Sequence, residues 1–264
     1  MALKSALINA MGNAARKAQR SLIRDFNEVE HLQVSKKGPA DFVSAADRKA
    51  EKILQGELAK LRPDFGFLME EGGRVEARDG RHYWIIDPLD GTTNFLHGIP
   101  HFAISVAVQR EGELIAGIVL DVIRDELFWA EKGVGAYLNE RRIRVSARRK
   151  LSEALFATGI PFLGRPGHAE FRRELAAVMG EVAGIRRMGS AALDLAYVAA
   201  GRYDGYWETG LSPWDVAAGI VLVREAGGMV TDYAGGDRMV ETSGIVAAND
   251  VLHAPLRKLL VQVG

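Results

Sequence analysis

Apolar residues recur every three or four positions along the N-terminal part of the chain. Between residues 3 and 26 they form one stripe of a helix, with lysine and arginine elsewhere around it. A second stripe starts near Ala45 and stops before Pro63, which predicts a second helix with Asp47 in its first turn. Residues 36–41, between the two helices, are rich in Lys, Gly and Pro and predict a polar loop.

Runs of aromatic and β-branched residues replace this periodicity after residue 64 and predict strands. The runs cover residues 65–69, 83–86, 102–109, 114–120 and 126–130. Short turns such as Glu111-Gly112 separate the later runs, as in a sheet of antiparallel strands. Residues 1–150 therefore predict an α+β half with an antiparallel sheet.

Strand and helix patterns alternate from residue 151 to the end. The predicted strands are residues 155–158, 185–188, 203–208, 229–231 and 245–248. The predicted helices are residues 169–179, 193–200, 216–226 and 252–261. This alternation is typical of helices packed on a sheet, so residues 151–264 predict an α/β half.

The centre of the chain carries a strand followed by two acids. Residues 83–86 predict a buried strand that Pro88 should end, because proline cannot donate to a β-ladder. Asp87 then lies at the carboxyl end of the strand, Asp90 follows across a tight turn, and Gly91 lets the backbone approach a ligand closely. The next residues lie where a helix would begin with its N–H groups facing outward. Two carboxylates beside an anion-binding turn indicate a divalent metal that bridges to a phosphate. A strand, a proline turn and an Asx-type cap are the alternative.

Five acidic residues share this kind of position. Glu70, Asp87 and Glu208 end predicted strands, and Asp90 and Asp215 enter predicted helices. Ligand sites in open α/β sheets lie beyond the carboxyl ends of the strands. Converging carboxylates repel one another without a cation, and hard oxygen ligands select Mg²⁺ or Mn²⁺. Taken singly, an acid in the first turn of a helix also complements the macrodipole.

Composition narrows the classes of chemistry. The 264 residues contain no cysteine, which excludes disulfides, thiolate zinc sites and a cysteine nucleophile. Lys plus Arg and Asp plus Glu both number 34, so the chain has no net field that attracts nucleic acid or a membrane. No apolar run approaches the ~18 residues of a membrane helix, and the N-terminus lacks the apolar region of a signal peptide. We therefore expect a cytoplasmic protein without a membrane anchor.

One stretch departs from this balance. Residues 141–150 hold six basic side chains, at Arg141, Arg142, Arg144, Arg148, Arg149 and Lys150. Ile143 and Val145 alternate with them, so one face of a strand can be buried while the charges stay in water. A solvated sheet edge, protected by charge from aggregation, is the main interpretation. Contact with nucleic acid or an acidic partner is the alternative.

Two long motifs make the chain resemble a known family. Residues 87–94 (Asp-Pro-Leu-Asp-Gly-Thr-Thr-Asn) and 214–219 (Trp-Asp-Val-Ala-Ala-Gly), with Glu70-Glu71 and residues 189–192 (Gly-Ser-Ala-Ala), resemble the inositol monophosphatase family of metal-dependent phosphatases. The resemblance runs over nearly the whole chain and is greatest to the bacterial inositol-1-monophosphatase branch, which the Thr93-Asn94-Phe95 continuation fits. It implies a single domain over residues 1–264, a layered αβαβα sandwich and a homodimer.

The resemblance also implies a role for each matched residue. Glu70, Asp87 and the carbonyl of Leu89 would hold a first Mg²⁺; Asp87, Asp90 and Asp215 would hold a second; and Glu70 would face a weaker third. The catalytic residues would be Thr92 with Asp47 behind it, which orient the attacking water, and Glu70. The N–H groups of Gly91 and Thr92 would cradle the phosphate. The remaining substrate contacts would come from Asp90, Ser190, Ala191, Glu208 and Asp215.

The implied activity is Mg²⁺-dependent hydrolysis of inositol monophosphate to myo-inositol and phosphate by a metal-activated water. Mn²⁺ would be a possible substitute for Mg²⁺, and the activity would be sensitive to lithium. Fructose-1,6-bisphosphate, histidinol phosphate and adenosine 3′,5′-bisphosphate are competing substrates within the family. A non-enzymatic role, binding RNA or the transcription machinery, is an alternative from another class. Gly72-Gly73 departs from the family pattern, which often has Ser after the Glu pair.

Overall fold

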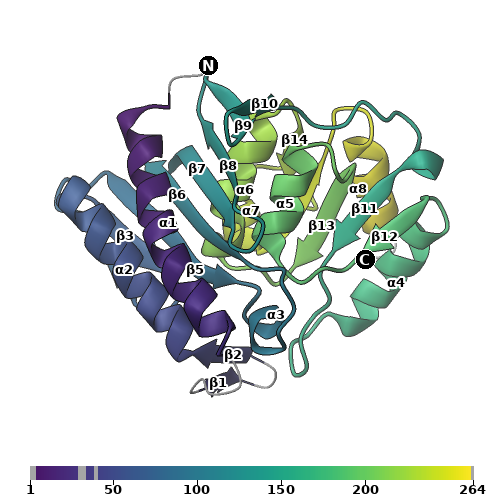
Figure 1. The fold of residues 1–264 in the computed structure, drawn as a ribbon. Coiled ribbons are helices and arrows are strands. Elements are labelled where there is room, and N and C mark those ends of the chain that lie inside the picture. The colour runs from purple at the N-terminus through teal and green to yellow at the C-terminus, as the bar shows by residue number, and fades with distance from the viewer. Residues whose placement is uncertain (1–3, 29–33, 39–40, 263–264) are drawn as a thin grey trace.

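The computed structural model describes residues 4–28, 34–38 and 41–262. Helices and sheets alternate in five layers across the molecule (Figure 1). The three helical layers are α1 (Ala6–Phe26) with α2 (Ala45–Leu61), α5 (Ala191–Ala199) with α6 (Pro213–Glu225), and α4 (His168–Met179) with α8 (His253–Val261). An eight-stranded and a five-stranded sheet lie between them. This arrangement confirms the expected αβαβα sandwich.

The eight-stranded sheet has the order β10-β9-β8-β7-β6-β5-β3-β4. Its strands are antiparallel except for the pair β3 and β5. Their bounds are β3 (Gly66–Met69), β4 (Gly73–Val75), β5 (His82–Asp90), β6 (Ala103–Arg110), β7 (Glu113–Asp121), β8 (Glu126–Glu131), β9 (Gly135–Leu138) and β10 (Arg141–Ile143). Apart from the parallel pair β3 and β5, the first half of the chain thus forms an antiparallel sheet.

The five-stranded sheet has the order β12-β11-β13-β15-β14. Strand β11 pairs in parallel with both of its neighbours, and the other pairs are antiparallel. The bounds are β11 (Leu155–Thr158), β12 (Gly184–Arg186), β13 (Gly205–Thr209), β14 (Met229–Thr231) and β15 (Gly244–Ala248). Two short helical turns, at Leu151–Glu153 and α7 (Met239–Thr242), complete the second half.

Alternation along the strands sends side chains to different layers. Trp84 and Ile86 of β5 pack with α1 and α2, while Ile85 packs with α5 and α6. In β13, Trp207 faces α8 and Tyr206 faces the central helices. The central helical layer is thus buried between the two sheets, where it holds both halves of the chain against one core.

Helix α1 begins where its sequence supplies a cap. The hydroxyl of Ser5 accepts a hydrogen bond from the backbone N–H of Ile8 at 3.1 Å, so the helix begins at Ala6 and not near residue 3. Its buried side chains include Met11, Ala18 and Leu22, at the spacing of one helical face. Among the described residues, no helix is long and apolar enough to cross a membrane.

Two predictions about chain breaks are wrong. Residues 36–41 were expected as a loop, but they lie mostly in an antiparallel pair, β1 (Val34–Gly38) and β2 (Asp41–Ser44). Strand β5 also continues through Pro88 to Asp90. The ladder with β6 steps from Asp87 to Asp90, so the proline that lacks an N–H falls within an irregularity of the pairing.

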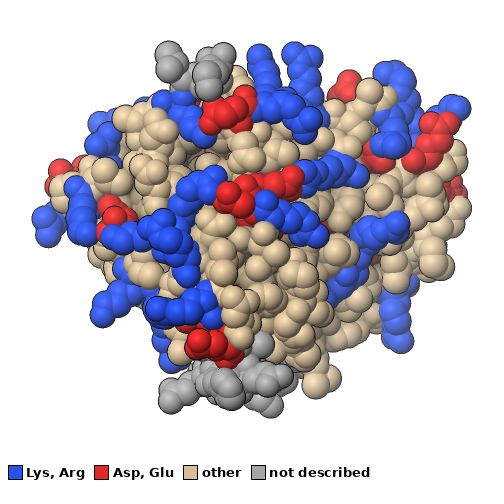
Figure 2. Space-filling view, in the orientation of Figure 1, with Lys and Arg blue, Asp and Glu red and all other residues tan. Residues whose placement is uncertain are grey.

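The basic stretch of residues 141–150 starts on an edge strand. Strand β10 pairs with β9 and ends the eight-stranded sheet, with the side chain of Ile143 buried and those of Arg141 and Arg142 exposed. Figure 2 shows Lys and Arg side chains near the top of the view, above the place of β10 in Figure 1, with acidic side chains close by. These positions agree with the predicted solvated sheet edge.

Candidate metal centre and active site

Three carboxylates converge between the two halves of the chain. Asp87 and Asp90 come from the end of β5, and Asp215 comes from the first turn of α6. One oxygen from each lies within 4.8 Å of the others. The structure therefore brings together three acids of the predicted metal site from two distant parts of the sequence.

The backbone holds one oxygen of each carboxylate in place. Each accepts a hydrogen bond from an N–H group of a turn or a helix start, which orients the side chain before any ligand binds. The bonds run from Leu89 to Asp87 Oδ1 (2.9 Å), from Ala192 to Asp90 Oδ2 (2.8 Å) and from Ser212 to Asp215 Oδ2 (2.7 Å). Asp90 also accepts from the hydroxyl of Ser190.

Burial and mutual repulsion act together on these acids. Burial raises the pKa of Asp87, and the charges of Glu70, Asp90 and Asp215 raise it further. Burial likewise raises the pKa of Asp215, with Asp90 as the strongest neighbouring charge. Burial raises the pKa of Asp90 to about 6 although its hydrogen bonds act against the shift. A divalent cation would relieve this repulsion, and an all-oxygen donor set suits Mg²⁺ or Mn²⁺.

Glu70 lies next to this cluster. It follows β3, and its backbone N–H donates to the carbonyl of Ile86 at 3.3 Å. Its charge raises the pKa of both Asp87 and Asp215. Its carboxylate is not part of the group of three whose oxygens lie within 4.8 Å of one another. Its position fits a ligand on one side of the cluster.

Thr92 connects the cluster to a buried acid. Its hydroxyl oxygen lies 3.0 Å from Asp47 Oδ1 and 3.0 Å from the carbonyl oxygen of Leu89. A hydroxyl has one proton and can donate to one acceptor at a time. Asp47 is fully buried in the first turn of α2, where it also complements the helix dipole. The structure thus places the Asp47 carboxylate beside the Thr92 hydroxyl.

A glycine turn follows the acids and begins helix α3 (Thr92–Leu96). Gly91 has φ 96°, a left-handed conformation that favours glycine. A Cβ at this position would lie 3.1 Å from the carbonyl oxygen of His101 and 3.3 Å from that of Gly189. The first N–H groups of a helix lack intrahelical acceptors and attract anions. The turn therefore presents a suitable place for a phosphate beside the carboxylates.

The other predicted substrate contacts come from the second half. Ser190 caps α5 by accepting from Leu193 N–H at 3.4 Å, and Ala191 is the first residue of that helix. The Glu208 carboxylate lies on β13 and accepts a hydrogen bond from the hydroxyl of Tyr206. Burial raises the pKa of Glu208 to about 7, against the lowering effect of the Tyr206 bond. Asp90 links the start of α5 to the carboxylate cluster, because it accepts hydrogen bonds from the Ser190 hydroxyl and the Ala192 N–H.

Three polar residues near the site have roles that the sequence did not predict. Tyr206 binds Glu208, and alternation along β13 was the signal that both face the same layer. The side-chain amide of Asn94 donates to the carbonyls of His101 (2.8 Å) and Met188 (2.7 Å), which fixes the loop around the glycine turn. Asp194 is buried, and burial followed by the charge of Glu208 raises its pKa. The packing of Asn94 and Asp194 had no signal in a single sequence.

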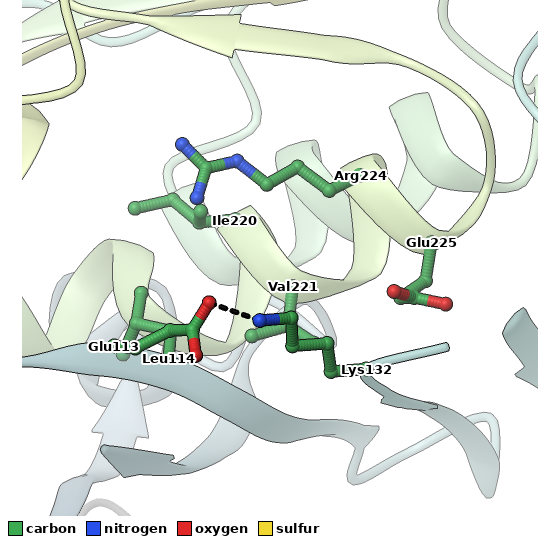
Figure 3. Close-up of a pocket in the computed structure, with 7 residues that line it drawn as sticks. All are labelled: Glu113, Leu114, Lys132, Ile220, Val221, Arg224 and Glu225. Carbon is green, nitrogen blue, oxygen red and sulfur yellow. Dashed lines mark hydrogen bonds and ion pairs between the residues drawn. The ribbon is translucent and has the colours of Figure 1, made fainter. Parts of the chain in front are cut away.

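A separate hollow of about 130 Å³ lies between β7 and α6 (Figure 3). Leu114, Ile220 and Val221 form its apolar part, and Lys132 pairs with Glu113 at its edge. Other residues that line it are also engaged, since Arg224 pairs with Asp237 and Glu225 accepts N–H bonds from Gly133 and Gly135. None of the three clustered aspartates, Asp87, Asp90 and Asp215, lines this hollow.

The chain is similar to known proteins over nearly its whole length. A family model described as the inositol monophosphatase family matches residues 3–264. The chain is 59% identical over 257 residues to an inositol-1-monophosphatase of Rhizobium meliloti, covering 97% of each protein. It is 46% identical over 247 residues to Nus factor SuhB of Pseudomonas aeruginosa, covering 92% of this chain and 91% of that protein. A crystal structure of the extragenic suppressor protein suhB from Bartonella henselae superposes with a TM-score of 0.95 at 57% identity, covering 97% of this chain and 98% of that one.

Proposed function

The chain belongs to the inositol monophosphatase family, and from this premise we propose that it is a Mg²⁺-dependent hydrolase of inositol monophosphates and related small polyol phosphates. The observation that carries the proposal is the convergence of Asp87, Asp90 and Asp215, whose oxygens lie within 4.8 Å of one another. Together with Glu70 and the carbonyl of Leu89, they form an oxygen-rich site for two or three cations.

The residues that would hold the ions are those of the cluster and its neighbours. When bound, Mg²⁺ supplies positive charge that offsets the charge on the phosphate and eases deprotonation of a water. The hydrogen bonds from backbone N–H groups keep one oxygen of each Asp fixed, which leaves the other to turn toward an ion. The three aspartate side chains would therefore need little movement when the ions and the substrate bind.

Thr92 and Asp47 would orient the attacking water. When the Thr92 hydroxyl donates to the Asp47 carboxylate, its lone pairs can accept an O–H from the water. This fixes the direction in which the water oxygen faces the phosphorus. The N–H groups of Gly91 and Thr92 would bind the non-bridging phosphate oxygens, because they lie at the start of α3.

Glu208 would recognise the hydroxyl groups of the substrate. A carboxylate accepts hydrogen bonds from neighbouring ring hydroxyls, and Glu208 is close enough to the cluster for its charge to raise the pKa of Asp215. Ser190 and Ala191, beside Asp90 at the start of α5, would line the same side of the site. These contacts favour a polyhydroxylated leaving group over an apolar one.

Phosphate release from a panel of monoesters tests the proposal. The panel contains inositol 1-phosphate, fructose-1,6-bisphosphate, histidinol phosphate and adenosine 3′,5′-bisphosphate, each with Mg²⁺, with Mn²⁺ and with EDTA. We expect the highest kcat/KM with inositol 1-phosphate and loss of turnover in EDTA. Equal turnover with and without a divalent cation would contradict the metal assignment, and a higher kcat/KM on another ester would reassign the substrate.

We also propose that the chain forms a homodimer, as its family resemblance implies. Large apolar side chains are exposed at Ile99, Phe162, Leu163 and Met188. Ile99 and Met188 belong to one neighbourhood, because Asn94 bonds to the backbone of both. Light scattering of the purified protein should give twice the mass of one chain, and a mass of 28.8 kDa would contradict the proposal.

A second candidate is an additional role in transcription. A relative at 46% identity is named Nus factor SuhB, and the basic residues 141–150 begin on an exposed sheet edge of this chain. Such an edge can contact RNA phosphates without blocking the carboxylate cluster. The salt dependence of RNA binding tests this candidate.

A further inference from the structure

Strands β11 and β13 bring a glycine next to Glu208. The two strands are parallel neighbours in which Thr158 pairs with Trp207. At the carboxyl ends of both strands, the Thr158 hydroxyl oxygen lies 2.8 Å from the carbonyl oxygen of Trp207 and 3.1 Å from that of Gly159. Gly159 follows Thr158 as Glu208 follows Trp207, so the two residues lie side by side.

The Glu208 side chain lies over the bare Cα of Gly159. An ideal Cβ on Gly159 would be 1.9 Å from both Cδ and Oε1 of Glu208 and 2.2 Å from Oε2. Non-bonded carbon atoms normally approach to about 3.5 Å. Every residue except glycine at this position is therefore incompatible with the present position of the carboxylate.

The requirement for glycine is one of space and not of backbone conformation. Gly159 is not among the glycines of the described chain with positive φ. A methyl group here would meet the end of a flexible side chain before any backbone atom. Substitution by alanine should consequently move the Glu208 carboxylate and leave the strands in place.

Displacement of this carboxylate has consequences for the site. Glu208 accepts a hydrogen bond from Tyr206, a fully buried residue, and a displaced carboxylate would lose that partner. Its present position also lets its charge act on Asp90 and Asp215. The position of the Glu208 carboxylate, on the side of the active site that would face the leaving group, thus depends on the absence of a side chain at Gly159.

We propose that Gly159 is a positioning residue that seats the Glu208 carboxylate and thereby sets the preference for phosphate esters that carry hydroxyl groups. The inference rests on the proposed phosphatase function and on the role of Glu208 within it. Gly159 itself contacts Glu208 and acts on the substrate through that side chain.

The kinetic test compares two esters in the Gly159→Ala variant. Inositol 1-phosphate carries ring hydroxyls, and p-nitrophenyl phosphate carries none. We expect kcat/KM for inositol 1-phosphate to fall about tenfold or more, mainly through KM, and kcat/KM for p-nitrophenyl phosphate to fall much less. Gly56→Ala is the matched control, because a methyl group there meets nothing within 4 Å. Equal losses on both esters would overturn the proposal.

A second comparison separates positioning from general damage. In a Glu208→Ala background there is no carboxylate to displace, so adding Gly159→Ala should cause no further loss on inositol 1-phosphate. The same fold-loss in both backgrounds would overturn the proposal.

A crystal structure of the Gly159→Ala variant gives a readout that needs no activity. A Glu208 carboxylate moved away from Tyr206 supports the proposal, and an unmoved carboxylate overturns it. If the unmodified protein hydrolyses neither ester, the proposed function fails, and this structure still decides what positions Glu208.

Discussion

The hydroxyl oxygen of Thr92 lies 3.0 Å from a carboxylate oxygen of Asp47, across 45 residues of sequence. Asp47 is fully buried and belongs to the first turn of α2, while Thr92 is the first residue of α3. When the Thr92 hydroxyl donates to this buried carboxylate, its lone pairs are directed elsewhere. The pair is therefore suited to hold a water in one orientation beside the metal cluster.

The first prediction concerns this pair. Thr92→Val keeps the shape of the side chain and removes the hydroxyl, so we expect kcat to fall about 10²-fold or more with little change in KM. Thr93→Val is the matched control, because the neighbouring threonine is exposed. Steady-state kinetics on inositol 1-phosphate measure both variants. Similar kcat values for the two would contradict the role given to Thr92.

The second prediction concerns the charge of Asp90. Asp90→Asn removes one charge from the cluster, so activity should fall by orders of magnitude while the metal-free fold survives, because repulsion among the acids is relieved. The Tm in EDTA should stay near that of the parent, and the rise in Tm on adding Mg²⁺ should shrink. Asp250→Asn, at an exposed position, is the control. Parent-like turnover in purified Asp90→Asn would rule out the metal assignment.

The third prediction concerns lithium. Li⁺ is close to Mg²⁺ in size but has half its charge. We therefore expect it to bind at Asp87, Asp90 and Asp215 after the ester has reacted and to slow release of phosphate. We expect inhibition at millimolar LiCl that strengthens as substrate rises. A KCl series at the same Mg²⁺ concentration controls for ionic strength. Inhibition that excess substrate overcomes would indicate instead that Li⁺ binds the free enzyme.

The fourth prediction concerns the dependence of stability on pH. Arg202 donates to both carboxylate oxygens of Glu126, at 2.6 and 2.5 Å, and these bonds hold the pKa of Glu126 below its ordinary value. A lowered pKa in the folded state stabilises the protein above the unfolded pKa, and this stability is lost as pH falls through the folded value. Glu126→Gln should therefore lower the free energy of unfolding at pH 7 by about 1–3 kcal/mol.

Denaturant unfolding at several pH values measures this effect. The difference in unfolding free energy between the parent and Glu126→Gln should shrink as pH falls below the ordinary range of a glutamate pKa, ~4.3. Glu153→Gln is a control on an exposed carboxylate. A difference that stays constant from pH 7 to acid pH would show that the Glu126 charge contributes nothing to stability.

The fifth prediction concerns the basic edge. If residues 141–150 bind RNA, affinity should fall steeply with salt, because phosphate contacts release counterions. Replacing Arg141, Arg142, Arg148 and Arg149 with Gln should abolish binding and spare the phosphatase activity. The control replaces four exposed basic residues elsewhere, Lys52, Arg62, Arg172 and Arg238, with Gln. Gel shifts without any RNA complex at low salt would leave the edge as a solvated one.

Local patterns were sufficient for much of the fold. The apolar stripe of α1, the strand runs of β6 and β7 and the proline at the start of α6 depend on neighbouring residues, so they could be read from the sequence. The paired strands β1 and β2 could not, since residues 36–41 have the composition of a loop and the pairing satisfies backbone groups. The continuation of β5 past Pro88 also depends on its ladder with β6.

The sequence by itself determined which residue types stand at the ends of the strands, and with the two long motifs it determined the family. Only the tertiary structure decided which of these residues meet. Asp215 reaches Asp87 and Asp90 because α6 packs between the two sheets, and Gly159 makes room for Glu208 because β11 and β13 pair in parallel. Such contacts depend on strand register and on how the layers pack, and these follow from the whole buried core rather than from any local pattern.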